Sequence, residues 1–294
     1  MKVAVYYPSS AHSTSPIHLS GGGPFPILLF AHAYRSLNED PTNGPLDRDF
    51  TELGSIMFHV ASYGCVCLVP DLSWAPAPGS QDDFSRRASV LTACYEYLLG
   101  PLNETLFSNQ LDLSHVVLAG HSTGGGGAAY AGSMLAGYSH VKSLAYGLVA
   151  PTQDSVNSAL TNVRNLVVIG SSWDIDQDAD PMQAYTASRT PKTLVMIPKA
   201  SHFGYTDNLC PSDNSCSRTV VEDVDGGISR SAQQNTAAAY LASLVRFYAL
   251  GDTTQTPYLT GQRIVEGLDT LGVNGIQVQS SGVTLRPTPA PNHP

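Results

Sequence analysis

The sequence predicts an α/β protein with a mostly parallel central sheet and helices on both of its faces. Short apolar runs, typical of strands buried on both sides, alternate along the chain with stretches of helical spacing. This order favours parallel pairing, because a helix between two strands returns the chain to the same edge of the sheet. Of the 294 residues, 42% are hydrophobic, which supplies a large core and excludes global disorder.

In the first half of the chain, strands are expected at 3–7, 27–31, 65–69 and 116–119. The run at 27–31 is entirely apolar, and Pro70-Asp71 ends the next one. Helical spacing predicts helices at 50–63 and 83–99, and Gly100-Pro101 stops the second of them. The Gly/Ala-rich stretch 123–136 predicts a further helix directly after a strand.

In the second half, strands are expected at 141–149, 166–169 and 193–197, and a long helix at 231–250. Another helix is expected to begin near Pro181, where an aspartate can cap it. The remaining segments are harder to assign: Thr260–Thr270 is a candidate helix and 275–278 a candidate extended segment.

Charge and hydropathy exclude several classes of partner. The chain has a net charge of -9 and no basic run, which argues against nucleic acid as its main partner. No apolar stretch approaches the roughly 20 residues that a membrane-spanning helix needs. Residues 1–8 lack the apolar segment of a signal peptide, so we expect a cytoplasmic protein or the mature form of a secreted one.

The five cysteines indicate no metal site. Cys65 and Cys67 belong to one expected strand, where we expect them to be core thiols on opposite faces. Cys210 and Cys216 flank a Pro/Ser/Asp/Asn loop that a disulfide would close, and such a bond would favour an oxidising compartment. Neither pair has a second pair at zinc-finger spacing. We expect no metal and no cofactor.

Ser122 is the candidate nucleophile, in the Gly-x-Ser-x-Gly pattern of residues 120–124. An expected strand runs into this pattern and a glycine-rich helix leaves it. Such a sharp turn holds the serine hydroxyl exposed above the sheet, and the glycines let the two backbones approach. The glycines also fit a dinucleotide-binding pattern superficially, but no acidic residue lies between Leu113 and Gln153 to bind a ribose.

A serine nucleophile needs a base that takes its proton and a carboxylate that orients the base. In hydrolases with this type of turn both follow the serine in the chain, the acid first. His202 follows the expected strand at 193–197 and is the candidate base. Asp174 is the candidate acid because it lies nearest the end of the strand at 166–169, and Asp176 is its rival. The surrounding aspartates lack the glycine and glutamate of a calcium loop.

An oxyanion hole needs two backbone N–H donors. Thr123, directly after the nucleophile, is expected to supply one, and Tyr34 the other, with Ala33 as the alternative. His32 either braces this loop or is a buried histidine with satisfied hydrogen bonds. His121, next to the nucleophile, is a candidate substrate contact.

Together these residues resemble the α/β-hydrolase superfamily over about residues 1–250. Within it, the chain is similar to cutinase-like polyester hydrolases, chlorophyllases and platelet-activating-factor acetylhydrolase-like esterases. The residues that carry the resemblance are Val5-Tyr6-Tyr7-Pro8, Ala33-Tyr34, the run 120–127, Asp174 and Ser201-His202-Phe203. The resemblance implies an α/β-hydrolase catalytic domain at 1–250, followed by an extension at 251–283 and a Pro-rich tail at 284–294. It also implies that Tyr34 lines the substrate cleft.

Two features depart from the polyester hydrolases. Their tryptophan after the sixth strand, which clamps an aromatic ring, has no counterpart at 149–154, so efficient attack on an aromatic polyester is not expected. The segment 203–230 is long and forms either one wall of the site or a surface loop. A lid domain, which many lipases carry, does not fit in the short segment 150–165, so we expect an open site.

The sequence therefore predicts a carboxylic ester hydrolase that acts through a Ser-His-Asp triad and an acyl-enzyme. Its expected partner is a small-molecule or polymeric ester with a short acyl group or a bulky structure, polyesters included. Two alternatives stay open. An amidase or peptidase would use the same residues, and a non-catalytic binding protein would keep the fold without the reaction.

Overall fold

A computed structural model describes residues 1–9, 19, 22–33, 49–72, 81–152, 159–174, 180–207, 227–264 and 276–284. Four of the residues to which a role or a bond was assigned above, Tyr34, Asp176, Cys210 and Cys216, lie outside these ranges. So do residues 208–226 of the long segment after His202 and the tail from 285 onwards.

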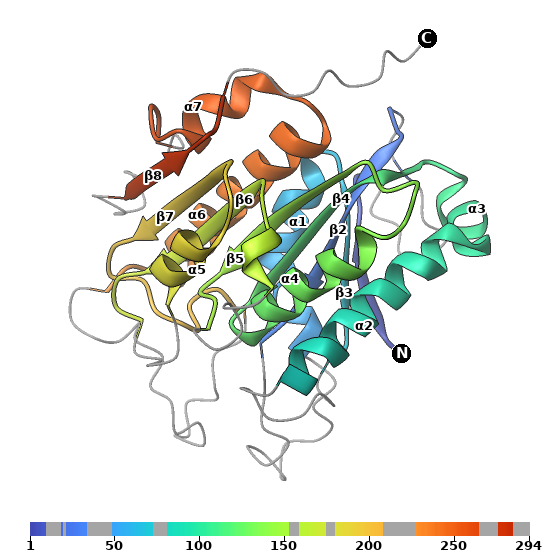
Figure 1. Ribbon diagram of the computed structural model, residues 1–294, viewed down its shortest axis with the longest axis horizontal. Helices are drawn as coiled ribbons and strands as arrows, with labels where there is room; N and C mark the ends of the chain where they lie inside the picture. Colours follow the sequence, from blue (N-terminus) through green and yellow to red (C-terminus); the bar gives the residue numbers. More distant parts are fainter. Residues whose placement is uncertain are drawn as a thin grey trace.

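An eight-stranded sheet forms the centre of the described structure, in the order β1-β3-β2-β4-β5-β6-β7-β8 (Figure 1). The six inner strands run parallel, whereas the edge strands β1 and β8 are antiparallel to their neighbours. This arrangement confirms the predicted α/β class with a mostly parallel sheet. The strand bounds are β1 Val3–Tyr6, β2 Phe25–Ala31, β3 Val66–Pro70, β4 Leu111–His121, β5 Ser143–Val149, β6 Leu166–Ser171, β7 Lys192–Ile197 and β8 Gln277–Ser281.

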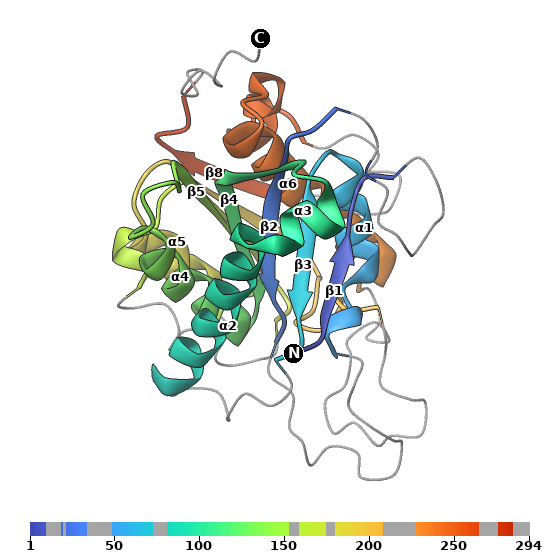
Figure 2. The same ribbon diagram turned by 90° about the vertical axis from the view of Figure 1, so that its right-hand side faces the viewer.

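Helices cover both faces of the sheet (Figure 2). Residues of α1 (Gly54–Ser62) and α6 (Arg230–Leu244) pack into the core on one face. On the other face lie α2 (Gln81–Leu99), α3 (Pro101–Phe107), α4 (Thr123–Leu135) and α5 (Pro181–Ala187). Two hydrophobic clusters therefore sandwich the sheet, as parallel sheets require.

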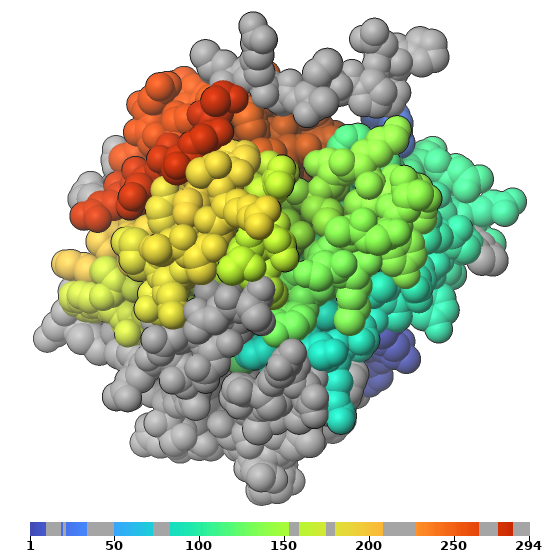
Figure 3. Space-filling view, in the orientation of Figure 1, coloured from blue at the N-terminus to red at the C-terminus, as the bar shows by residue number. Residues whose placement is uncertain are grey.

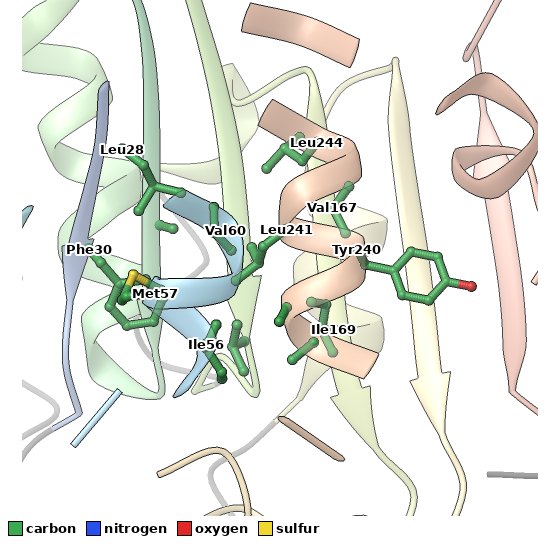
Figure 4. Close-up of a cluster of buried hydrophobic side chains, with 14 of the residues drawn as sticks. Leu28, Phe30, Ile56, Met57, Val60, Val167, Ile169, Tyr240, Leu241 and Leu244 are labelled. Atoms are coloured by element: carbon green, nitrogen blue, oxygen red, sulfur yellow. The ribbon is translucent and has the colours of Figure 1, made fainter. Parts of the chain in front are cut away.

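Successive side chains of β2 point to opposite faces of the sheet, so that one strand contributes to both hydrophobic clusters. Ile27 and Leu29 pack on the side of α2 and α4, whereas Leu28 and Phe30 pack on the side of α1 and α6. All four side chains are fully buried. Figure 4 shows the second side, where α1 and α6 meet the strands. Burial on both faces explains why the sequence is continuously apolar here.

The described cysteines, Cys65, Cys67 and Cys94, are buried and free. Cys65 and Cys67 share one side of the sheet, with their Sγ atoms 3.5 Å apart, so the expectation of opposite faces is wrong. Side chains two residues apart in extended chain point the same way. Burial, with Cys65 alongside, raises the pKa of the Cys67 thiol, which keeps it protonated.

Proline and glycine explain where the helices begin and end. The helix expected at 83–99 ends at Leu99 as predicted, and Pro101 then begins α3, at a position where its missing N–H costs nothing. The candidate helix at Thr260–Thr270 is wrong in its described part, since α7 spans Thr256–Leu259 and residues 260–263 form turns. Gly261 has a φ of 75°, a left-handed conformation that ends helices.

The last described segment completes the sheet. The extended run expected at 275–278 corresponds to β8, which pairs with β7 along one side of the molecule (Figure 3). The long helix expected at 231–250 is α6 followed by a π-helical turn at Val245–Ala249. None of the helices in the described ranges is long and apolar enough to cross a bilayer.

Candidate active site

Ser122 stands on a sharp turn between β4 and α4. Its φ of 55° and ψ of -127° are unusual for a residue with a side chain and match the strained conformation of a nucleophile on such a turn. The Ser122 N–H donates to the main-chain oxygen of Val149 in β5 at 2.9 Å, which ties the turn to the neighbouring strand. The surrounding structure therefore holds the strained backbone in place.

Glycines make this turn sterically feasible. A Cβ atom on Gly120 would overlap the backbone of Gly124, and one on Gly124 would overlap the main-chain oxygen of Ala31 at the end of β2. The strand, the helix and the neighbouring strand end thus meet backbone to backbone, as the sequence pattern predicts.

Asp174 and His202 come together after two adjacent strands. Asp174 follows β6 and His202 follows β7, and the carboxyl ends of these parallel strands lie at one edge of the sheet. The His202 Nδ1 atom lies 3.1 and 3.0 Å from the two carboxylate oxygens of Asp174. Their side chains are only 1% and 6% exposed, so solvent competes little for this contact.

The loop that carries His202 is held by residues that sequence reasoning missed. The side-chain amide of Gln233 in α6 accepts from the Ser201 N–H at 3.0 Å and donates to the Ser201 carbonyl at 2.6 Å. On the other side, the hydroxyls of Tyr205 and Ser171 lie 2.6 Å apart. Two glutamines among the alanines of α6 were the available signal, because buried polar side chains require partners.

His121 lies behind the candidate base. Its side chain is 1% exposed, and its Nε2 atom is 2.8 Å from the main-chain oxygen of His202. Burial, together with the nearby His202, holds the pKa of His121 well below its usual value. A neutral imidazole packed inside the protein is poorly placed for the substrate contact that we expected from the sequence.

Thr123, the expected oxyanion donor, is the first residue of α4. Its N–H therefore has no intrahelical acceptor and lies at the positive end of the helix dipole. The other expected donor, Tyr34, falls outside the described ranges.

His32 braces the loop that precedes Tyr34, as one of the two readings of the sequence predicts. Its Nε2 atom accepts from the Leu72 N–H at 2.8 Å, so the proton is on Nδ1, which donates to the Ala33 carbonyl at 2.7 Å. His32 is also buried, and both of its ring nitrogens have hydrogen-bond partners. The two interpretations made from the sequence are therefore both correct.

A buried ion pair supports the same loop from α2. Arg87 donates through Nη1 to the His32 carbonyl at 3.0 Å and through Nε to Asp83 at 2.9 Å, and both side chains are 0% exposed. Gly127 of α4 leaves the space for it, since a Cβ there would lie 2.6 Å from the Arg87 Cβ. The i, i+4 spacing of Asp83 and Arg87 was visible in the sequence, but their partner was not.

The described residues contain no group of three or more histidine, cysteine, aspartate or glutamate side chains arranged to hold a metal ion. The arrangement that remains is a serine on a strained turn, with a carboxylate–imidazole pair at the same edge of the sheet. This combination can perform acyl transfer.

Comparison with known protein families matches residues 8–154, half of the chain, to chlorophyllase. The chain belongs to the chlorophyllase family. The match runs from before β2 to just beyond β5 and includes Tyr34, His121, Ser122 and Thr123. No curated protein matches the chain significantly.

Membership of the chlorophyllase family makes the chain an ester hydrolase of the α/β-hydrolase type, with the α/β-hydrolase fold. This agrees with the resemblance seen in the sequence. Asp174 and His202 lie beyond the part that matches the chlorophyllase family, so the case for their roles is geometric.

Proposed function

We propose that the chain hydrolyses carboxylic esters through Ser122, His202 and Asp174. The observation that carries this proposal is the contact of His202 Nδ1 with both carboxylate oxygens of Asp174, in a buried setting at the edge of the sheet where Ser122 stands. The carboxylate accepts from Nδ1–H, which leaves Nε2 as the nitrogen that takes up a proton.

The reaction proceeds in two halves. Ser122 Oγ attacks the ester carbonyl while His202 Nε2 takes the hydroxyl proton, and His202 then returns this proton to the departing alcohol. Water attacks the acyl-enzyme while His202 Nε2 takes one of its protons, the bond to Ser122 Oγ then breaks, and His202 returns the proton to Oγ as the acid is released. The N–H groups of Thr123 and Tyr34 stabilise the oxyanion in both halves. Asp174 orients His202 and stabilises its charged form.

The substrates that we propose are esters with a short acyl group or a bulky structure. Residues 150–165, between β5 and β6, leave no room for a lid domain. The family name makes chlorophyll, itself a bulky ester, one substrate to test. Aliphatic polyesters are a second class, whereas the lack of an aromatic residue at 149–154 disfavours aromatic polyesters.

Hydrolysis of a short p-nitrophenyl ester by wild type and Ser122→Ala tests the proposal. We expect kcat/KM of the variant to fall by about 10³-fold or more, as loss of a triad member does. Ser114→Ala is the matched control, since Ser114 lies at the opposite end of the same strand and should keep its activity. Equal rates for wild type and Ser122→Ala would refute the proposal.

Further assays of the same protein distinguish the ester hydrolase from an amidase and from a non-catalytic binding protein. A matched p-nitroanilide, cleaved faster than the ester, would make the chain an amidase. A folded wild type that cleaves neither substrate and does not react with a fluorophosphonate would make it a binding protein.

A further inference from the structure

His121 connects the two residues that carry the proposed reaction. It directly precedes Ser122, and its Nε2 atom lies 2.8 Å from the main-chain oxygen of His202, 81 residues later in the chain. A carbonyl oxygen can only accept, so Nε2 carries the proton and donates it. One side chain thus spans the distance between the backbone of the nucleophile and the backbone of the base.

The surroundings of His121 keep it neutral. Its ring centroid lies 5.0 Å from that of His202, 5.6 Å from Tyr205 and 6.3 Å from Phe203. The titratable groups that act on it are His202, Tyr205 and, from the end of β2, His32. Burial above all, and then His202, lowers the pKa of His121, so the Nε2–H form persists in neutral and mildly acidic solution.

Packing alone does not explain a histidine at this position. The Nδ1 atom of His121 is buried and has no hydrogen-bond partner among the groups that the structure describes. Leaving a buried polar atom unsatisfied costs stability, and a phenylalanine would fill the same aromatic setting without that cost. The chemical property that distinguishes the histidine is therefore its Nε2–H donor.

We propose that His121 is a positioning residue that fixes the main chain of His202 relative to Ser122. This inference rests on the proposed function of those two residues. The proton transfer between them needs hydrogen-bond geometry that is kept through successive steps of the reaction. A displacement of about 1 Å in such geometry can lower a rate by about 10²-fold.

Two amide variants of His121 test whether the Nε2–H donor, and not the aromatic ring, positions His202. Glutamine extends far enough to place its amide N–H₂ near the position of Nε2, whereas asparagine reaches only the position of Nδ1. We expect His121→Gln to keep kcat within about 3-fold of wild type, and His121→Asn and His121→Phe to lose roughly 10- to 100-fold with KM nearly unchanged. Thermal unfolding midpoints check that all three variants are folded at the assay temperature.

A second measurement does not depend on turnover. In spectra of ¹⁵N-labelled histidine, we expect a sharp Nδ1–H resonance of His202 in wild type and in His121→Gln. In His121→Asn and His121→Phe we expect this resonance to broaden or double, because the loop is no longer fixed. Should Ser122→Ala be as active as wild type, the proposed function fails, and this resonance still decides whether His121 orders His202.

Two results would overturn the inference. One is an unchanged kcat and an unchanged His202 resonance in both His121→Asn and His121→Phe. The other is a rise in KM with constant kcat, which would assign His121 to substrate binding, as the sequence first suggested.

Discussion

The contact of His202 Nδ1 with both carboxylate oxygens of Asp174 decides which nitrogen of the imidazole takes up a proton. Because the carboxylate only accepts, it selects the tautomer with hydrogen on Nδ1. The low exposure of both side chains strengthens this selection, since little water competes for the carboxylate. Asp174 thus selects the tautomer of the candidate base.

The first prediction at this scale concerns Asp174→Asn. Asparagine can donate to Nδ1 and so favours the wrong tautomer, and we expect kcat for a short p-nitrophenyl ester to fall by about 10³- to 10⁴-fold with little change in KM. Asp176→Asn, the sequence rival, is the matched control and should stay within about 3-fold of wild type. Reversed results would reassign the acid to Asp176.

At the scale of elements, helix α6 works as a support for the loop of the base. Its N-terminal turn is capped by Ser229, and Gln233 one turn later binds both backbone polar groups of Ser201. Gly204 allows this approach, because a Cβ there would overlap the Gln233 amide. The helix thus supplies hydrogen-bond partners for the backbone of the loop after β7.

Gln233→Leu tests this support. The Ser201 N–H would lose its partner and the Ser201 C=O would keep only a long contact, 3.5 Å, with the Ser171 hydroxyl, so we expect the free energy of unfolding to fall by about 1–3 kcal/mol. We also expect hydrogen exchange in residues 201–207 to accelerate by roughly 10-fold. Thr236→Val, at a buried site on the same helix whose hydroxyl bonds only within α6, should leave that exchange unchanged. Equal exchange in both variants would show that Gln233 does not hold the loop.

At the scale of the whole molecule, two histidines with lowered pKa values, the buried His121 and the partly buried His59, make stability depend on pH. In the unfolded chain a histidine titrates near pH 6.5. Burial lowers the folded pKa of His121 strongly and also lowers that of His59. Below about pH 6.5 the unfolded chain therefore binds protons that the folded chain does not, and the free energy of unfolding decreases as the pH falls.

Urea unfolding at pH 7 and pH 5 measures this effect. We expect wild type to lose stability over this interval at up to about 1.4 kcal/mol per pH unit from His121, with a smaller contribution from the partly exposed His59. His121→Phe should show a shallower slope, because one of these groups is gone. Asp112 affects the free energy of unfolding only at lower pH. Burial raises the pKa of its carboxyl, but hydrogen bonds from His115 and Ser114 outweigh this effect and lower the pKa to about 2. Parallel slopes for the two proteins would contradict the prediction.

Local patterns allowed much of this architecture to be predicted. The turn at Ser122 is encoded by adjacent residues, and the places of Asp174 and His202 follow from the strands directly before them. The contacts that support the site are non-local. Gln233 meets Ser201 across 32 positions and Arg87 meets His32 across 55, and no periodicity indicates such pairs. In the described part of Thr260–Thr270, residues 260–264, helical spacing led to a wrong expectation because Gly261 ends α7.

The composition of α4 also has a practical meaning for anyone who wishes to alter this protein. Most of its buried residues are glycine and alanine. Even at Gly132, farther along the helix from the turn at Ser122, the Tyr146 hydroxyl leaves no space for a methyl group. A mutagenesis library that randomises this helix would therefore consist largely of misfolded members. Diversity aimed at new substrates is better placed outside this helix, where an added side chain does not displace the backbone that holds Ser122.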